Sequence, residues 1–133
     1  MPWRRRRGRL GDNLKKVVRL VQRVVVTGPG GEESVRAKVD TGADRTTVDE
    51  ALAARLLLVP TGSKVAVKAS AGGKSVERPL VNAAVTLAGI RFNLKVGVAD
   101  RSQMRYAVIV GRDILRSGDF LIDPSRRKKN AQP

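Results

Sequence analysis

The sequence predicts an all-β domain that closes into a barrel and carries one or two short helices. Most of the chain divides into short segments in which apolar and polar residues alternate, which is the period of a β-strand, and turns rich in glycine separate these segments. Only 3% of the 133 residues are aromatic. The core must therefore be built from Val, Leu, Ile and Ala, and the abundant β-branched Val favours strands. A chain of this length is enough for one domain.

The first part of the chain predicts a hairpin that ends at an aspartate. Residues 17–27 are rich in Val and indicate one long strand or two joined strands. A Gly-Pro-Gly-Gly turn follows at 28–31, and a strand over 34–39 then leads into Asp40. Asp40 thus comes directly after the end of a strand.

A short helix is expected over residues 50–57. Asp49 precedes it and is a residue type that caps helix N-termini, the first turn is acidic, and Pro60 follows the helix as a stop signal.

Residues 64–69 and 74–87 predict a second, longer hairpin around a glycine-rich turn. Such a hairpin fits either a mobile flap over a site or a plain connection, and the residues alone leave both open. Gly-Lys-Ser at 73–75 resembles the end of a phosphate-binding loop, but position 68 is Lys where that loop needs glycine, and a strand rather than a helix follows. Nucleotide binding is therefore not expected.

The last third of the chain begins with the clearest alternation in the protein, over residues 90–98. A polar loop leads to an apolar run at 106–110, which is typical of a strand buried on both faces. A short helix over 111–116 and a final strand at 120–122 complete the domain. No internal repeat is present, and the pattern is that of a closed all-β architecture.

The composition limits the available chemistry. The chain has no Cys and no His, so disulfides, thiolate nucleophiles, imidazole bases and ordinary zinc sites are excluded. An enzyme with this composition would depend on carboxylates, and no cofactor or metal is expected.

The chain is strongly basic, with 27 Lys and Arg against 12 Asp and Glu and a net charge of +15. Such a charge predicts attraction to polyanions such as nucleic acid, ribosomes, acidic peptides or anionic membranes, without choosing among them. Part of it lies in runs near both ends, which we interpret as solvated tails over residues 1–15 and 125–133 around a domain at 16–124. No apolar stretch of signal-peptide or membrane-spanning length is present, so we expect a cytoplasmic protein.

Asp40 is the strongest candidate for a catalytic residue. The strand before it delivers its carboxylate onto an Asp-Thr-Gly turn, where Gly42 allows backbone N–H groups to approach without a Cβ in the way and Thr41 adds a hydroxyl. Asp-Thr-Gly also occurs in ordinary turns. The motif alone therefore leaves both a catalytic and a purely structural role open.

Two segments together extend this interpretation: Asp-Thr-Gly-Ala-Asp at 40–44 and Val-Ile-Val-Gly-Arg-Asp-Ile-Leu at 108–115, with the glycine-tipped hairpin between them. In this order, over about residues 20–123, the chain resembles the retropepsins, the single-lobe, dimeric aspartic proteases that include the retroviral enzymes. The resemblance implies a retropepsin-like barrel, catalysis by Asp40, Thr41 and Gly42, flap or substrate contacts by Ala69, Ser70, Ala71, Gly72, Gly73, Lys74, Ala43 and Asp44, and an ion pair between Asp44 and Arg112. The alternative for the last two is a pair of unrelated surface charges.

A narrower resemblance rests on the loop at 100–106, the Gly-Arg at 111–112 and the Phe-Leu-Ile-Asp at 120–123. These segments are similar to prokaryotic retropepsin-like proteins often labelled "ATP-dependent zinc proteases". The label does not fit this chain, which has neither zinc-binding His or Cys nor a phosphate loop. Asp44 also departs from the Arg or Lys expected at this position in many of these relatives.

The resemblance implies a homodimer that hydrolyses peptide bonds. Carboxylate-based hydrolysis uses two carboxyls, and one chain holds one Asp-Thr-Gly, so a second copy would supply the other. The positive charge, with Lys68, Lys74 and Arg78 beside the expected flap, favours acidic peptides as substrates and allows weak binding to polyanions. A rival hypothesis is a non-catalytic module of the same fold that binds RNA, ribosomes or acidic peptides through its basic surface.

Overall fold

The computed structural model describes residues 15–68 and 74–125. In chain order, its elements are β1 (Val17–Arg19), β2 (Val21–Gly28), β3 (Gly31–Val39), β4 (Thr47–Asp49), α3 (Glu50–Arg55), β5 (Val59–Lys68), β6 (Ser75–Leu87), β7 (Ile90–Ala99), β8 (Val108–Val110), α4 (Arg112–Ser117) and β9 (Leu121–Asp123). No helix in these two ranges is long and apolar enough to cross a membrane.

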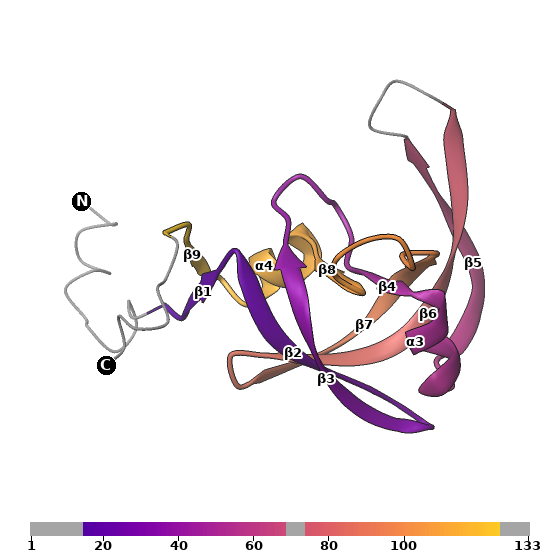
Figure 1. Cartoon of the computed structure of the whole chain (residues 1–133), viewed down its shortest axis with the longest axis horizontal. Coiled ribbons are helices and arrows are strands. Elements are labelled where there is room, and N and C mark those ends of the chain that lie inside the picture. Colours follow the sequence, from indigo (N-terminus) through magenta and orange to yellow (C-terminus); the bar gives the residue numbers. More distant parts are fainter. Residues whose placement is uncertain (1–14, 69–73, 126–133) are drawn as a thin grey trace.

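Six strands close into a barrel in the order β2-β3-β8-β4-β7-β6, and the pairing of β2 with β6 completes the ring. The β3–β8 and β4–β7 pairs are parallel, and the other pairs in this sheet are antiparallel. β5 adds to the outer side of β6, and the two strands extend away from the barrel as a long hairpin (Figure 1). The predicted all-β closed barrel with two short helices is confirmed.

The core inside the barrel is aliphatic, as the composition predicted. Its fully buried side chains are mainly valines from β1, β2, β4, β6, β7 and β8, with single leucines and an isoleucine from the helices and β6. Two of the few aromatic residues, Phe92 and Phe120, meet edge to face at the margin of this core, with ring centroids 6.1 Å apart. This contact holds the segment before β9 against β7.

The first helix is capped as expected but is shorter than predicted. The Asp49 side chain accepts a hydrogen bond from the Ala51 N–H at 3.1 Å, and α3 ends at Arg55 rather than residue 57. The helix ends here because the β2–β3 hairpin packs against its last turn, where the Gly30 N–H donates to the Leu56 carbonyl at 2.8 Å. A Cβ at Gly28 would lie only 2.5 Å from that carbonyl oxygen.

Several strand boundaries differ from the expectation. The Val-rich segment forms two strands, β1 and β2. β4 was not foreseen, because Thr-Val-Asp is too short for a periodicity and is not part of an apolar run like the one that predicted β8. β5 begins at Val59, before the predicted start, and its pairing with β6 shifts register between Pro60 and Lys64. Gly62 lies in this irregular stretch with φ of +88°. The bulge breaks the alternation, which explains why the sequence pattern began later.

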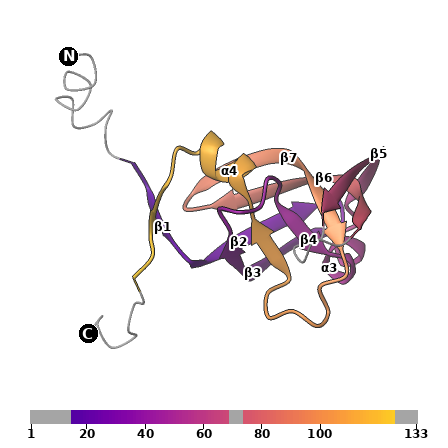
Figure 2. The same ribbon diagram turned by 90° about the horizontal axis from the view of Figure 1, so that it is seen from above.

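β1 and β9 form a separate two-stranded parallel sheet beside the barrel. Val17, Val18 and Arg19 are opposite Leu121, Ile122 and Asp123 in register. The two strands lie side by side at one end of the molecule in both views (Figures 1 and 2). The expected final strand therefore exists, one residue later than predicted, and pairs with the start of the same domain.

Candidate active site

The Asp-Thr-Gly segment is a tight loop at the end of β3. The Asp40 N–H donates to the Val110 carbonyl of β8 at 2.9 Å, so the loop starts from a strand inside the barrel sheet. The Gly42 N–H donates to Asp40 Oδ1 at 2.9 Å, and the Ala43 N–H donates to the Asp40 carbonyl at 3.2 Å. Asp40 is partly exposed. The loop thus presents one oriented carboxylate that solvent can reach.

Arg112, the first residue of α4, holds the same loop from the other side. Its Nη1 donates to the Thr41 carbonyl at 2.6 Å, its Nη2 is paired with the Asp44 carboxylate, and its backbone N–H donates to the Ala43 carbonyl at 2.8 Å. The Asp44 side chain is 88% exposed, so its charge attraction adds little to stability. The contacts to the two backbone carbonyls fix the loop, and Asp44 keeps the guanidinium in place.

A buried cluster behind the loop was not identified from the sequence. Thr46 is fully buried, and its hydroxyl donates to Asp113 Oδ1 at 2.7 Å while its N–H lies 3.1 and 2.9 Å from the two carboxylate oxygens. Asp113 also accepts from the Ile114 N–H at 2.8 Å, and the Gly111 N–H donates to Thr46 Oγ1 at 3.1 Å. The sequence signal for this cluster was Asp113, an acid in the first turn of the helix that follows Gly-Arg. By itself, such an acid indicates only a charge that favours the helix N-terminus.

Gly111 is required where the two segments cross. A Cβ at this position would lie 2.7 Å from the Arg45 carbonyl carbon and 2.9 Å from the Ala43 carbonyl oxygen. Both neighbours are backbone atoms, which cannot move aside as a side chain can. The close crossing brings α4 near enough for Arg112 to reach the loop.

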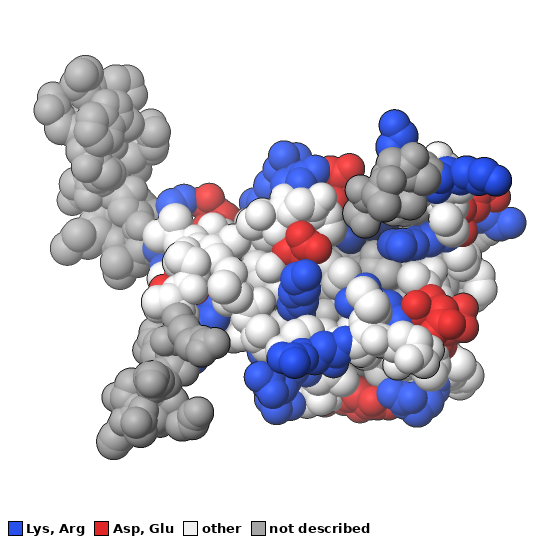
Figure 3. Space-filling view, turned by 45° about the horizontal axis from the view of Figure 1, so that its top comes forward, with Lys and Arg blue, Asp and Glu red and all other residues white. Residues whose placement is uncertain are grey.

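A cleft of about 460 Å³ lies beside the loop. One wall is the loop itself at residues 42–45, another is the described end of β5 at residues 65–68, and Thr47, Arg78 and Ile109 complete the lining. Of the predicted flap residues, Lys74 is exposed just before β6, and 69–73 lie outside the described residues. Lys and Arg side chains are spread widely over the face shown in Figure 3, whereas Asp and Glu form a few separate groups.

Arg101 anchors the loop that precedes β8. Its backbone N–H donates to Asp49 Oδ1 at 2.7 Å, and its Nε donates to the Tyr106 carbonyl at 2.8 Å. Burial lowers the pKa of the Arg101 guanidinium, and the nearby positive charge of Arg78 lowers it further. The sequence indicated a polar loop here, but it did not indicate that Arg101 bonds to both Asp49 and Tyr106 and so holds the loop in place.

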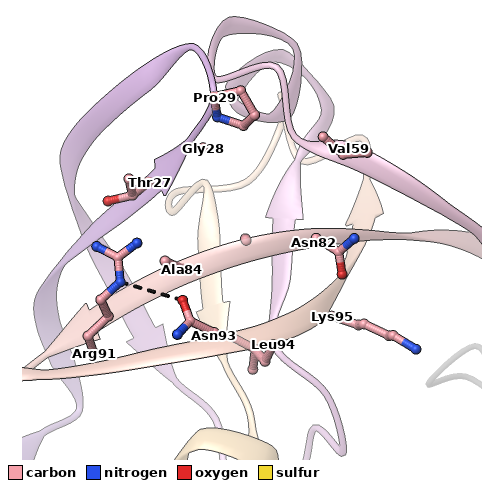
Figure 4. A pocket seen from close by; sticks show the side chains of 11 residues that line it. Thr27, Gly28, Pro29, Val59, Asn82, Ala84, Arg91, Asn93, Leu94 and Lys95 are labelled. Atoms are coloured by element: carbon pink, nitrogen blue, oxygen red, sulfur yellow. Dashed lines mark hydrogen bonds between the residues drawn. The ribbon is translucent and has the colours of Figure 1, made fainter.

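A larger cavity of about 650 Å³ lies between β6, β7 and the tip of the β2–β3 hairpin. Figure 4 shows Arg91 pointing toward Asn93, with a hydrogen bond of 3.5 Å between them, and Lys95 pointing away from this pair. The described lining includes no carboxylate. This cavity therefore does not provide the acid and base groups that the loop at Asp40 provides.

We predict that Thr46→Val destabilises the domain by about 1–3 kcal/mol, because it leaves the buried Gly111 N–H and one Asp113 lone pair without a partner. Thr47→Val is the matched control, since the Thr47 hydroxyl makes only a 3.5 Å contact to the Arg45 carbonyl. Denaturant unfolding of the two variants measures the difference. Equal stabilities would show that the cluster does not hold the loop.

Comparisons with known proteins agree with this geometry. A family model described as "Aspartyl protease" matches residues 23–114. The EIAV protease complexed with the inhibitor HBY-793 is 26% identical, with a TM-score of 0.55 over 79% of this chain and 90% of that chain. A protein of unknown function from Legionella pneumophila, Lpg0085, has a TM-score of 0.56 at 18% identity over 87% of this chain and 98% of that chain, and shares the fold alone.

No curated protein matches the sequence at a significant level. The comparisons support the broader retropepsin-like relationship and do not show the narrower similarity to prokaryotic proteins labelled as zinc proteases. The family match covers well over half of the chain and includes Asp40, the loop at residues 42–45 that lines the cleft, and the Gly-Arg at the start of α4. The chain belongs to the aspartyl protease family and has the retropepsin-like barrel fold.

Proposed function

We propose that the protein is a homodimeric aspartic endopeptidase whose two Asp40 carboxylates, one from each chain, activate water for peptide hydrolysis. The observation that carries this proposal is the partly exposed Asp40 carboxylate directly after β3, which the Gly42 N–H orients at 2.9 Å on a loop whose residues 42–45 line a cleft. The family match supports the same chemistry.

The reaction needs two carboxyl groups in different protonation states. Two carboxyls about 3 Å apart do not both ionise, so the pair shares one proton. The ionised group takes a proton from water as the water oxygen bonds to the peptide carbonyl carbon, and the protonated group donates to the carbonyl oxygen. As the tetrahedral intermediate collapses and the C–N bond breaks, the carboxyl that took the water proton donates it to the leaving nitrogen, and the hydroxyl formed from the carbonyl oxygen returns its proton to the other carboxylate.

One chain contains a single Asp-Thr-Gly, so the second carboxylate comes from another copy. A two-fold axis between the two Asp40 residues places them symmetrically with one repeated interface. The Thr41 carbonyl accepts a hydrogen bond from Arg112. The Thr41 side chain is exposed, and in the proposed dimer it lies on the surface that a second copy would approach. We assign Thr41 and Gly42 to orienting the pair.

The β1–β9 sheet is the proposed dimer contact. A two-stranded sheet is marginal by itself, and unpaired strand edges readily accept further strands. Val17 and Leu121 are 56% and 53% exposed, and Leu20 beside them is 47% exposed. Pairing with the same sheet of a second copy would cover these apolar side chains.

The hairpin of β5 and β6 is the proposed cover of the substrate. Its described part lines one side of the cleft through residues 65–68 and Arg78. The sequence assigned the flap itself to residues 69–74, and this assignment remains a proposal. Excluding water around the peptide strengthens the electrostatic interactions within the cleft.

We predict that specific activity falls on dilution, because the site is complete only in the dimer. Leu121→Glu introduces a charge into the proposed contact and should shift the sedimentation coefficient toward the monomer. Leu57→Glu is the control, since Leu57 is 62% exposed and lies after α3. A monomer that stays fully active at high dilution would contradict the shared site.

We also predict that Asp40→Asn abolishes cleavage of unfolded protein substrates, while folding and dimerisation are retained. The substitution keeps the size of the side chain and removes the ionisable group. Glu32 is an exposed acid near the start of β3, the strand that leads to Asp40, and the Glu32→Gln variant should cleave like the wild type. If Asp40→Asn cleaves as fast as the wild type, Asp40 is a turn residue only, and a wild type without activity at any pH would favour the binding-module alternative.

A further inference from the structure

A third hollow, which we name the basic groove, lies on the outer side of β2 and β3. It has a volume of about 630 Å³ and is lined by Arg23, Ser34, Val35, Arg36, Arg105, Tyr106 and Ala107. Three of these seven residues are arginines, and none is acidic. Neither the hydrolytic chemistry nor the fold explains this concentration of charge.

The basic groove lies along β3, the strand that leads to Asp40. Side chains alternate along a strand, so Arg36 and Lys38 project to one side of β3, and Asp40 directly follows the strand. Arg36 is four residues from Asp40, which corresponds to about 13 Å along an extended strand. Lys38 lies between them and is opposite Ile109 of β8, a residue that lines the cleft. Lys38 therefore lies along β3 between the groove, which Arg36 lines, and the cleft, which Ile109 lines.

The positive charge in the groove is not balanced within the described part of the chain. Arg23 and Arg36 are directly opposite each other on the antiparallel strands, an arrangement that like charges disfavour. Arg23 donates to the Ser34 hydroxyl at 3.2 Å, and the Arg36 guanidinium lies 5.9 Å from the centre of the Tyr106 ring. In residues 15–68 and 74–125, neither arginine has an ion pair with an acid. An external anion would relieve this repulsion.

We propose that the basic groove binds Glu or Asp side chains of the peptide substrate, three or four residues from the bond that is cleaved. This inference rests on the proposed peptidase function. Planar guanidinium groups bind carboxylates with two parallel hydrogen bonds, and Arg36 is held ready by Tyr106. A two-fold dimer has one groove on each side of the cleaved bond, so acidic residues on both sides should add their effects.

An acidic peptide fits the groove better than single-stranded nucleic acid. Nucleic-acid grooves combine cations with exposed aromatic rings on which successive bases stack. Here Tyr106 is the single aromatic residue in the lining, and Arg36 lies over its ring. An extended peptide leaving the cleft past Lys38 would instead bring side chains into the groove directly.

The test measures binding separately from cleavage. The Asp40→Asn protein is titrated with a fluorescent extended peptide that has Glu at the third and fourth positions on both sides of the central bond, and with its Gln counterpart. At low salt we expect the Glu peptide to bind about tenfold more tightly, and the difference to shrink as salt rises. In cleavage by the wild type, the same preference should appear in kcat/KM.

The groove variant carries Arg23→Gln and Arg36→Gln together in the Asp40→Asn protein. Removing two opposed like charges should leave folding intact, and the two peptides should then bind equally. Arg91→Gln, in the separate cavity of Figure 4, is the control and should keep the preference. Equal binding of both peptides to the parent protein, or a preference that survives the groove variant, would overturn the inference.

Two further outcomes separate the hypotheses. If the Glu peptide binds through the groove but the wild type cleaves neither peptide, the proposed peptidase function fails and the groove remains a site for acidic peptides. If a single-stranded RNA oligonucleotide of equal charge binds more tightly than the Glu peptide and depends on the same arginines, the groove is a nucleic-acid site and the inference is wrong.

Discussion

The position of the Asp-Thr-Gly loop depends on a partly buried carboxylate outside the loop, that of Asp113. Asp113 accepts the hydroxyl and N–H of Thr46, and Thr46 in turn accepts the Gly111 N–H at 3.1 Å. This cluster joins the segment after Asp40 to the start of α4 around the buried Thr46, where a low local dielectric strengthens hydrogen bonds. Because α4 is fixed there, Arg112 reaches the Thr41 carbonyl and the Asp44 carboxylate. The position of the loop thus follows from a buried contact, and the exposed ion pair adds to it.

The few acidic residues near the site have distinct roles. Asp49 caps α3 and holds the Arg101 backbone, Asp113 holds Thr46, and Asp44 is paired with Arg112. Asp40 differs from them, since the described contact of its carboxylate is one hydrogen bond from the Gly42 N–H. A carboxylate that is oriented but not consumed by structural contacts is suited to proton transfer. In our account, the Lys and Arg side chains around the site bind the substrate.

Much of the fold was predictable from the sequence because its strongest signals are local. The alternation over residues 90–98, the Gly-Pro-Gly-Gly turn and the Asp49 cap each correspond to an element of the structure. β4 was not predictable because Thr-Val-Asp is too short for a period and, unlike β8, is not part of an apolar run, and the register shift in β5 interrupts the alternation there. The site was predicted at Asp40 from a motif. Its supports at Thr46, Asp113 and Arg101 were missed because they are contacts between segments 52 or more residues apart.

The central claim is that each active site needs one Asp40 carboxylate from each of two chains. Mixed dimers test it most directly: wild type and Asp40→Asn are unfolded together, refolded at varied ratios and assayed at constant total protein. If both carboxylates are needed, activity follows the square of the wild-type fraction, and an equal mixture has about one quarter of full activity. If the equal mixture instead retains about half, each chain acts by itself, and if it retains about three quarters, one Asp40 per dimer is sufficient; either result contradicts the shared-site account.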